Sequence, residues 1–231
     1  MLSVIIPCYN EERRIASTLA RIHEYLSAQA IPYEIIVVDN GSTDATRQKA
    51  EVCMAQIPEL RIVTHESFGK GWAVKQGMLE AIGDYRLFTD ADNSTDIKHV
   101  ESLIKEANAG YDVVIGSRRI KGAHIAHPQK AFRRALGNIF AWAIQVIVPL
   151  GIKDTQNGFK LFTKKAAEDI FPQQRSYFWA FDIEILALAK KNGYKIKEVP
   201  IEWINNEESK MDVWGMARMI LDVIVIRIRA Y

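Results

Sequence analysis

The sequence has few cysteines, no long uninterrupted apolar run and almost no net charge. Its 231 residues include only two cysteines, Cys8 and Cys53, which form no CxxC pair. This argues against a disulfide framework and favours a reducing compartment. A formal net charge of +2 is too small to indicate nucleic acid as a partner. The content of 48% hydrophobic and 25% charged residues is typical of a folded globular protein with a sizeable core.

No segment has the pattern of a signal peptide or of a membrane span. The opening MLSVIIPCYNEE has no basic region before its apolar run, and Pro7 ends that run, so we predict a strand there. The most apolar segment, residues 135–152, contains two polar residues and a proline, whereas a spanning helix needs about 20 mainly apolar residues. It is interpreted either as a buried helix or as a helix at a membrane interface, with Arg133 and Arg134 at the head groups.

Strand-like and helix-like segments alternate through the first half of the chain. β-Branched apolar runs predict strands, and apolar residues at helical spacing, such as Ile15, Leu19 and Ile22, predict helices between them. Alternation with short links predicts an α/β fold with a mostly parallel sheet and helices on both faces. The strands are expected at residues 2–7, 33–40, 61–65, 85–92 and 111–118, and the helices at 11–29, 44–56, 69–81 and about 97–107.

The second half is less regular, but without a linker or an internal repeat we expect a single domain over residues 1–231. Its segments are interpreted as a mobile loop (121–130, KGAHIAHPQK), an apolar helix (131–148), a helix from about 164, an amphipathic helix (179–191), a late strand (194–203), a loop (207–210, EESK) and an apolar tail from 213.

Two carboxylates stand one residue apart where the fourth strand ends, in the stretch TDAD. Asp90 and Asp92 point to the same side of an extended chain, and like charges this close repel each other. A divalent cation removes that repulsion, and Mg²⁺ or Mn²⁺ prefers oxygen ligands and completes its shell with substrate phosphates. The pair therefore indicates a phosphate-bearing substrate. The alternative is a solvated turn, with Asp92 or Ser94 capping the next helix.

Other polar residues follow neighbouring strands. Ligands of parallel sheets bind beyond the carboxyl ends of the strands, so we expect Asp39, Asp90, Asp92 and Arg118 to converge on one site. An acid at the position of Asp39 can bind a base or a ribose, although DNGS is also a strong turn sequence. Arg118, Arg133 and Arg134 suit a second anion because guanidinium matches phosphate geometry; each is alternatively a surface charge.

Two glycines, Gly69 and Gly71, flank Lys70 where a helix is expected to begin. This arrangement resembles a loop that cradles phosphate with backbone N–H groups. It is not a P-loop, because the spacing differs and Trp72 stands where serine or threonine is required.

With these residues assembled, the chain resembles the inverting GT-A glycosyltransferases of family 2. The match rests on five motifs in order: VIIPCYNEE, IIVVDNGSTD, GKGWAVKQG, TDAD and GSR. The later motifs DTQNGFKLF, WAFDIEIL, EVPIEW and ESK look like the dolichyl-phosphate β-glucosyltransferase branch. The resemblance implies transfer of glucose from UDP-glucose to a polyprenyl or dolichyl phosphate, with Mg²⁺ or Mn²⁺. It implies a nucleotide-sugar-binding half, 1–120, and an acceptor and membrane-interface half, 121–231.

The resemblance also implies roles for single residues on the donor side. Asp92, with Asp90, would hold the metal that bridges the diphosphate. The nucleotide sugar would be bound by Pro7, Tyr9 and Glu11 in the nucleoside pocket, Asp39 at the base or ribose, and Lys70, Gly71 and Asp90 along the rest of the donor.

On the acceptor side, the resemblance implies that Arg118 and Arg133 hold the lipid phosphate, together with Gln156. Lys210, in the ESK motif, would close over the diphosphate. Asp182, in WAFD, matches the position where many family members carry a general base. Because a lipid phosphate is already an anion at neutral pH, we expect Asp182 to orient or assist the reaction and not to act as an obligatory base.

Two departures favour the glucosyl over the mannosyl branch, in which GDP-mannose is the donor. Related mannosyltransferases often carry glutamine where Ser94 stands and arginine where Ile204 stands. A polyprenyl phosphate keeps its tail in the bilayer, so the helix 131–148 and the tail from 213 are expected at the membrane surface. The protein is therefore expected at the cytoplasmic face of a membrane.

Other readings of the same residues remain open at this point. Transfer to a glycan hydroxyl would make Asp182 an essential base. A nucleotidyltransferase can share this sheet, but it normally needs a basic glycine-rich loop where PCYNEE stands. A non-enzymatic sugar-nucleotide-binding partner subunit is the last alternative, and intact Asp90, Asp92 and Lys210 argue against it. An oligomeric assembly is also left open.

Overall fold

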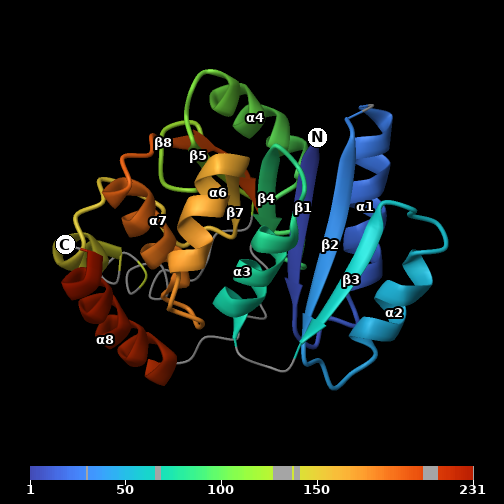
Figure 1. Cartoon of the computed structure of the whole chain (residues 1–231), viewed down its shortest axis with the longest axis horizontal. Helices are drawn as coiled ribbons and strands as arrows, with labels where there is room; N and C mark the ends of the chain where they lie inside the picture. The colour runs from blue at the N-terminus through green and yellow to red at the C-terminus, as the bar shows by residue number, and fades with distance from the viewer. Residues whose placement is uncertain (30, 66–68, 127–136, 138–140, 205–212, 231) are drawn as a thin grey trace.

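The computed structural model describes residues 1–29, 31–65, 69–126, 137, 141–204 and 213–230. At its centre is a seven-stranded sheet with the strand order β3-β2-β1-β4-β7-β5-β8 (Figure 1). A two-stranded sheet pairs β6 with β9. The strands are β1 (Leu2–Cys8), β2 (Tyr33–Asn40), β3 (Leu60–His65), β4 (Tyr85–Thr89), β5 (Val113–Ser117), β6 (His124–Ile125), β7 (Phe159–Thr163), β8 (Ile196–Pro200) and β9 (Glu202–Trp203).

Helices cover both faces of the main sheet. They are α1 (Ile15–Ala28), α2 (Thr46–Cys53), α3 (Lys70–Glu80), α4 (Val100–Asn108), α6 (Lys164–Ile170), α7 (Phe181–Lys191) and α8 (Val213–Ala230), with short 3₁₀ turns at Ile97–His99 and Phe171–Gln173. Successive residues of a strand point to opposite faces. On β1, Ile5 packs with α3, α6 and α7, whereas Val4 and Ile6 pack with α1, α2 and α4. Helix α8 packs on the outside of α7.

Strand β7 runs antiparallel to both of its neighbours, β4 and β5, and the other pairs of the main sheet are parallel. The expected mostly parallel sheet is therefore confirmed, with one reversed strand that the sequence pattern did not reveal. Reversal brings the start of β7 to the edge where β4 and β5 end. Asn157 and Gly158, just before β7, consequently lie at the carboxyl edge of the sheet.

Helix α1 begins at Ile15, later than the expected residue 11. The reason is that Glu11 and Glu12 use their backbone N–H groups outside the helix. Glu11 N donates to Thr46 Oγ1 at 2.7 Å and Glu12 N donates to Asp44 Oδ2 at 3.2 Å. The next helix, α2, is correspondingly shorter than the expected 44–56.

The helix expected over residues 179–191 is confirmed as α7, but its expected amphipathic character is wrong. Residues 181–189 of α7 are all buried, including Asp182 and Glu184. The physical reason is that the sheet side of α7 and its outer side are both covered, the latter by α8.

The expectation of a mobile loop over residues 121–130 is also wrong in its described part, because residues 124–125 form β6 and pair with β9. The late strand expected over 194–203 is divided into β8 and β9 at Pro200. Proline has no N–H group to continue a strand ladder, so it ends strands at a sheet edge.

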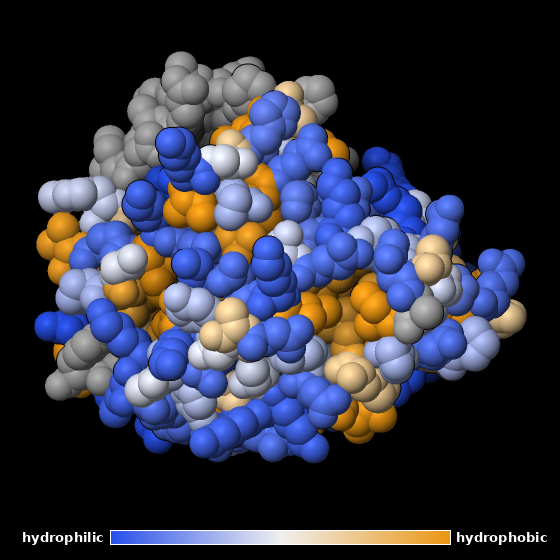
Figure 2. Space-filling view, turned by 90° about the horizontal axis from the view of Figure 1, so that it is seen from above, coloured by the Kyte–Doolittle hydropathy of each residue, from blue (hydrophilic) through white to orange (hydrophobic). Residues whose placement is uncertain are grey.

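The edge of the sheet at the amino ends of its strands presents a mainly hydrophilic surface (Figure 2). Among the described residues, none of the helices combines the length and the apolar character that crossing a bilayer requires. Of the apolar helix expected over 131–148, residue 137 and residues 141–147 are helical. The rest of 131–140 and the loop 207–210 lie outside the described residues.

Candidate active site

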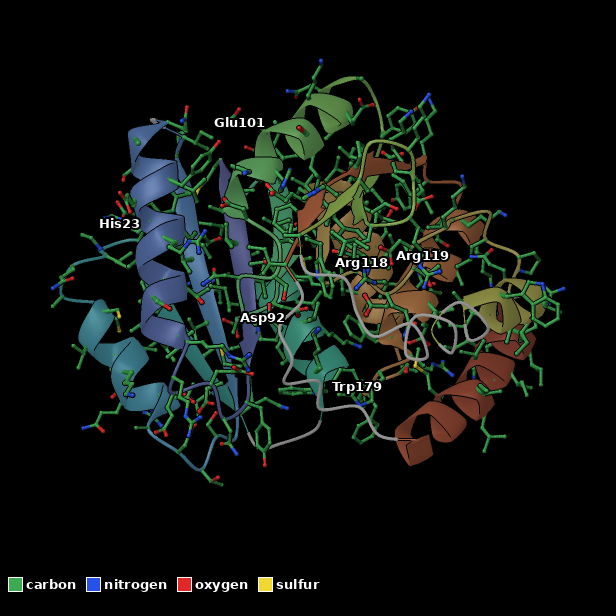
Figure 3. All side chains as sticks on the ribbon, turned by 180° about the vertical axis from the view of Figure 1, so that it is seen from behind. His23, Asp92, Glu101, Arg118, Arg119 and Trp179 are labelled. Atoms are coloured by element: carbon green, nitrogen blue, oxygen red, sulfur yellow. The ribbon has the colours of Figure 1, made fainter. Side chains whose placement is uncertain are left out.

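The two carboxylates of TDAD lie at the carboxyl edge of the sheet, where Figure 3 labels Asp92. Lys70, the first residue of α3, places its Nζ 2.5 Å from Asp90 Oδ1. Burial by itself lowers the pKa of Lys70, but the charges of Asp90, Asp182 and Asp92 outweigh burial and hold that pKa above its usual value. One ammonium group therefore faces three carboxylates, two that follow β4 and one from α7.

The surroundings of Asp92 raise the pKa of its carboxyl group. Burial, and then the charge of Asp90, raises the pKa of Asp92, although its Oδ1 accepts a hydrogen bond from Ser94 N at 2.9 Å. Within the described part of the chain, no three His, Cys, Asp or Glu side chains are grouped to hold a metal ion. Two neighbouring carboxylates fit Mg²⁺ or Mn²⁺ when substrate phosphates supply further ligands.

Gly158 packs directly against the carboxylate of Asp90. A Cβ atom at residue 158 would lie 2.2 Å from Asp90 Oδ2, 2.5 Å from its Cγ and 2.7 Å from its Oδ1. No carbon atom can approach a carboxylate so closely, so only glycine leaves room for this position of Asp90. The NGF stretch before β7 is the sequence signal that marks this contact.

Asp182 lies in the first turn of α7 and is bound to a buried lysine of β7. Lys160 Nζ donates hydrogen bonds to Asp182 Oδ1 and to the carbonyl oxygen of Asn157. Burial raises the pKa of Asp182 and lowers that of Lys160, and their attraction opposes both shifts. Asp182 also acts on the pKa of Lys70, so its carboxylate belongs to the same cluster of charges.

Arg118 follows β5 on the other side of β7 (Figure 3). Its Nε and Nη2 atoms each donate to Asp154 at 2.8 Å, and its guanidinium lies 5.1 Å from the ring centroid of Trp203. Asp154 is almost fully buried. Although burial lowers the pKa of Arg118, Asp154 raises it overall. Arg118 is thus held in one orientation, and its charge also reaches Asp90 and Asp182.

The amides at the start of α3 do not form the phosphate cradle that the glycine pattern resembles. Gly71 N and Trp72 N both donate to the carbonyl oxygen of Tyr177, at 2.9 and 3.3 Å. Gly69 has a φ of +107°, and a Cβ there would lie 2.3 Å from the same oxygen. Gly69 therefore allows close packing on residue 177, and Gly71 allows close packing on Phe181 and the carbonyl oxygen of Ser176. Lys70 contributes its side chain to the site.

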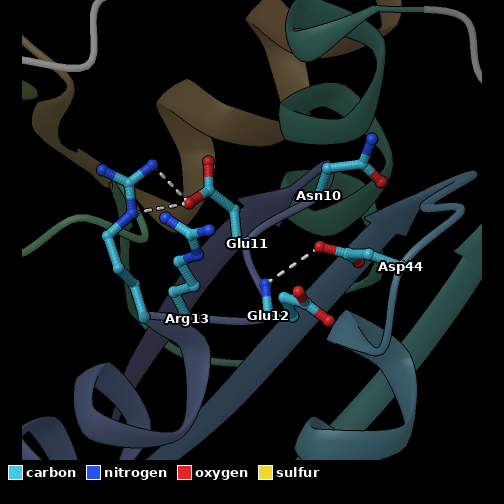
Figure 4. Close-up of a pocket in the computed structure, with 6 residues that line it drawn as sticks. Asn10, Glu11, Glu12, Arg13 and Asp44 are labelled. Carbon is cyan, nitrogen blue, oxygen red and sulfur yellow. Dashed lines mark hydrogen bonds and ion pairs between the residues drawn. The ribbon is translucent and has the colours of Figure 1, made fainter.

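Two loops at the carboxyl edge, residues 9–14 after β1 and 41–46 after β2, hold each other by reciprocal hydrogen bonds. Glu12 N donates to Asp44 Oδ2, and Ala45 N donates to Glu12 Oε2 at 3.1 Å. The loops line a polar pocket of about 190 Å³ (Figure 4). Much of the NEE and GSTDAT motifs therefore serves to fix these loops.

The residues expected to bind the nucleoside surround this pair of loops. Pro7 lies near the end of β1, and Tyr9, directly after that strand, is 44% exposed. Asp39, near the end of β2, is buried and accepts a hydrogen bond from the backbone of the following turn. The carboxylate of Glu11 is bound to the Arg14 guanidinium at 2.7 Å.

Gln156 and Arg133 were expected at the acceptor phosphate, and Lys210 over the donor diphosphate. Gln156 Nε2 lies 3.4 Å from the sulfur of Met219, which joins the segment before β7 to α8. Arg133 and Lys210 lie outside the described residues, and their roles stay predictions.

Sequence reasoning missed Asp154, Gly158 and Lys160. All three lie in or next to the DTQNGFKLF motif, which we used only for its resemblance to the glucosyltransferase branch. Each of them contacts a charged residue that the sequence had already singled out: Arg118, Asp90 and Asp182.

A family model described as Glycosyl transferase family 2 matches residues 3–171. The chain belongs to this family. The resemblance seen in the sequence is confirmed, and the family 2 chain is an enzyme that transfers sugars.

Curated relatives of this glycosyltransferase match it over almost its whole length. Dolichyl-phosphate β-glucosyltransferases are 36% identical in Trichomonas vaginalis (97% of this chain, 70% of the relative), 36% in Saccharomyces cerevisiae (98% and 74%) and 34% in Homo sapiens (99% and 75%).

Solved structures show that this family 2 enzyme has the GT-A fold. Glucosyl-3-phosphoglycerate synthase from Mycobacterium tuberculosis, solved with Mn²⁺, uridine diphosphate and glucosyl-3-phosphoglycerate, matches with a TM-score of 0.74 at 17% identity. The match covers 100% of this chain and 79% of that one. A structure of the same synthase with Mg²⁺ and uridine diphosphate also has a TM-score of 0.74.

Proposed function

We propose that the chain transfers glucose from UDP-glucose to a polyprenyl phosphate of the dolichyl phosphate type, with inversion at the anomeric carbon and with Mg²⁺ or Mn²⁺. The observation that carries this proposal is the 34–36% identity, over nearly the whole chain, to dolichyl-phosphate β-glucosyltransferases. The cluster of Asp90, Asp92 and Lys70 supports the donor side. The structural neighbour that was solved with Mn²⁺ and uridine diphosphate supports the metal and the base.

The residues that would bind the nucleotide-sugar donor are assigned from the charged side chains at the carboxyl edge of the sheet. Asp90 and Asp92 would hold the metal ion, which supplies Lewis-acid stabilisation of the leaving diphosphate. Lys70, which is partly exposed, is within reach of the same place and stabilises the negative charge that develops on the diphosphate. Asp39 and Tyr9, on the fixed loops after β1 and β2, bind the nucleoside. Lys210 adds a further cation from the ESK motif.

The acceptor needs orientation more than activation. A lipid phosphate is an anion at neutral pH, so its oxygen attacks the anomeric carbon without a base, while the sugar develops oxocarbenium character. Arg118 presents five N–H donors, of which Asp154 takes two, and the others suit the acceptor phosphate, with Arg133 and Gln156. Asp182 orients the reacting groups from within the cluster. In this assignment residues 1–120 supply most of the donor site and residues 121–231 most of the acceptor site, with Arg118 and Lys210 as the two exceptions.

Sugar transfer from radiolabelled donors tests the proposal directly. Purified protein is incubated with UDP-glucose or GDP-mannose, Mg²⁺ or Mn²⁺ and a short polyprenyl phosphate, and the labelled glycolipid is extracted. We expect glycolipid from UDP-glucose only. Glycolipid from GDP-mannose would reassign the donor. Nucleotide release without glycolipid would overturn the acceptor and favour transfer to a hydroxyl group.

We further propose that the enzyme lies on the cytoplasmic face of a membrane through α8 and the neighbouring helical residues 141–147. The inner face of α8 is buried through Met219, Val223 and Ile226. Its outer face exposes four apolar residues at helical spacing: Leu221, Ile224, Val225 and Ile228. Residues 141–147 lie beside α8 in Figures 1 and 3 and expose Trp142 and Val146. Exposed apolar surface of this extent marks an interaction site.

Charging the outer face of α8 tests this membrane contact. Leu221 and Ile228 are 64% and 75% exposed, so Leu221→Glu/Ile228→Glu leaves the core intact. Full burial of one such side chain contributes about 1.5–3 kcal/mol, so the double variant is expected to float with phosphatidylserine-containing vesicles at least 10-fold less than wild type. Val52→Glu is the matched control, because Val52 is equally exposed but lies on α2. Equal flotation of the double variant and the control would refute the assignment.

A further inference from the structure

Lys160 is a fully buried cation in the middle of the active-site cluster, and none of the roles described so far uses it. It lies on β7, the reversed strand, and its side chain has no exposed surface. Its Nζ donates to Asp182 Oδ1 and to the Asn157 carbonyl oxygen, and lies 5.2 Å from the ring centroid of Phe88. These contacts fix the ammonium group in a single place.

A buried ammonium group is very costly unless a buried charge and further hydrogen bonds compensate it. Asp182 is that charge, and it is itself only 5% exposed. For stability alone, an apolar pair of the same volume would serve as well or better. The location of the pair explains why the charges are present. Lys160 binds the carbonyl oxygen of Asn157, and the next residue, Gly158, packs directly against Asp90. On the other side, Phe181, which precedes Asp182, packs against Gly71 at the start of α3, next to Lys70.

We propose that Lys160 is a positioning residue of the transfer reaction, which acts by holding the Asp182 carboxylate in the active site. Its ammonium group binds Asp182 Oδ1 beside β7 and opposes the rise that burial causes in the pKa of that carboxyl group. The bond to the Asn157 carbonyl oxygen prevents the lysine from following any movement of α7. Lys160 itself touches neither donor nor acceptor. The kinetic test of this proposal rests on the proposed function, because it measures sugar transfer.

A double-mutant cycle separates positioning from general stability. Lys160→Met, Asp182→Asn and the combination of both are compared for kcat, for donor KM and for the temperature of unfolding. If Lys160 acts through Asp182, each single variant loses about 10- to 100-fold in kcat with little change in donor KM, and the double variant is no worse than either single one. Lys75→Met is the matched control, because Lys75 donates to the carbonyl oxygens of Pro172 and Gln174 and, among the described residues, to no carboxylate.

Two results would overturn the proposal. One is wild-type kcat in a folded Lys160→Met variant. The other is a double variant in which the two losses multiply, because Lys160 would then act independently of Asp182. If Lys160→Met does not fold, the double variant, which has no unpaired buried charge, is compared with Asp182→Asn alone. Equal kcat values support the proposal, and a further loss refutes it.

Failure of the proposed function can be told apart from failure of this inference. If the wild-type enzyme forms no glycolipid from any donor, the acceptor assignment is wrong. The cycle is then measured on metal-dependent release of nucleotide from the donor in water, which needs no acceptor. Non-additive losses in that reaction would still support Lys160 as a positioning residue, and independent losses would still refute it.

Discussion

Asp92→Asn is expected to lower kcat/KM for sugar transfer by about 10³-fold or more, because a neutral amide replaces a carboxylate that would hold the metal ion. Loss of a Lewis acid removes several kcal/mol of transition-state stabilisation, and each 1.36 kcal/mol is a factor of about ten in rate. Asparagine has the size of aspartate and keeps an oxygen acceptor for Ser94 N. The measurement is transfer kinetics together with binding of Mn²⁺ in the presence of UDP.

The same Asp92→Asn substitution is expected to maintain or raise the thermal stability of the metal-free protein, although it lowers activity. Burial and Asp90 raise the pKa of Asp92, so the ionised carboxylate destabilises the metal-free fold at neutral pH. This penalty begins to fall as the pH drops to the raised pKa and is absent below the ordinary pKa of an aspartate. Asp92→Asn should therefore unfold at the same or a higher temperature than wild type without metal. Asp96→Asn is the matched control, since Asp96 caps the next turn through Lys98 N. A destabilised Asp92→Asn, or one with normal Mn²⁺ binding, would contradict the assignment.

Gly158→Ala is expected to lower kcat by about 100-fold, because the added Cβ would displace Asp90. At present that atom would lie 2.2 to 2.7 Å from the carboxylate atoms of Asp90. A displacement of about 1 Å at an active site can cost about 100-fold in rate, and overpacking typically costs about 1–3 kcal/mol of stability. Kinetics and thermal unfolding measure the two effects.

A second substitution shows whether the collision is the cause. In Gly158→Ala/Asp90→Ala the carboxylate is absent, so unfolding should return toward the temperature of Asp90→Ala alone while activity stays lost. Gly110→Ala serves as the glycine control: a Cβ there meets nothing within 4 Å, although its φ of +96° adds local strain. Normal activity in Gly158→Ala would show that Asp90 has room to move.

The predictions from the sequence were confirmed where they depend on a local residue pattern. Residues such as Ile15, Leu19 and Ile22 form a buried helix face because helix periodicity depends only on near neighbours. The helix α7 was predicted, but its amphipathic character was not confirmed, because Asp182 and Glu184 are both buried. Their partners are distant from them in sequence or outside the helix: Lys160 of β7 binds Asp182, and the backbone N–H groups of residues 175 and 176 bind Glu184.

The sequence by itself determined the alternation of strands and helices, the carboxylate pair Asp90 and Asp92 at a strand end, and the family, through the order of its motifs. Only the tertiary structure decided which residues surround that pair. Arg118 meets Asp154 and Lys160 meets Asp182 across 36 and 22 residues of chain. Those contacts exist because β7 enters the sheet between β4 and β5 in the reverse direction. Strand order and direction arise from packing of the whole sheet, so local residue patterns do not predict them.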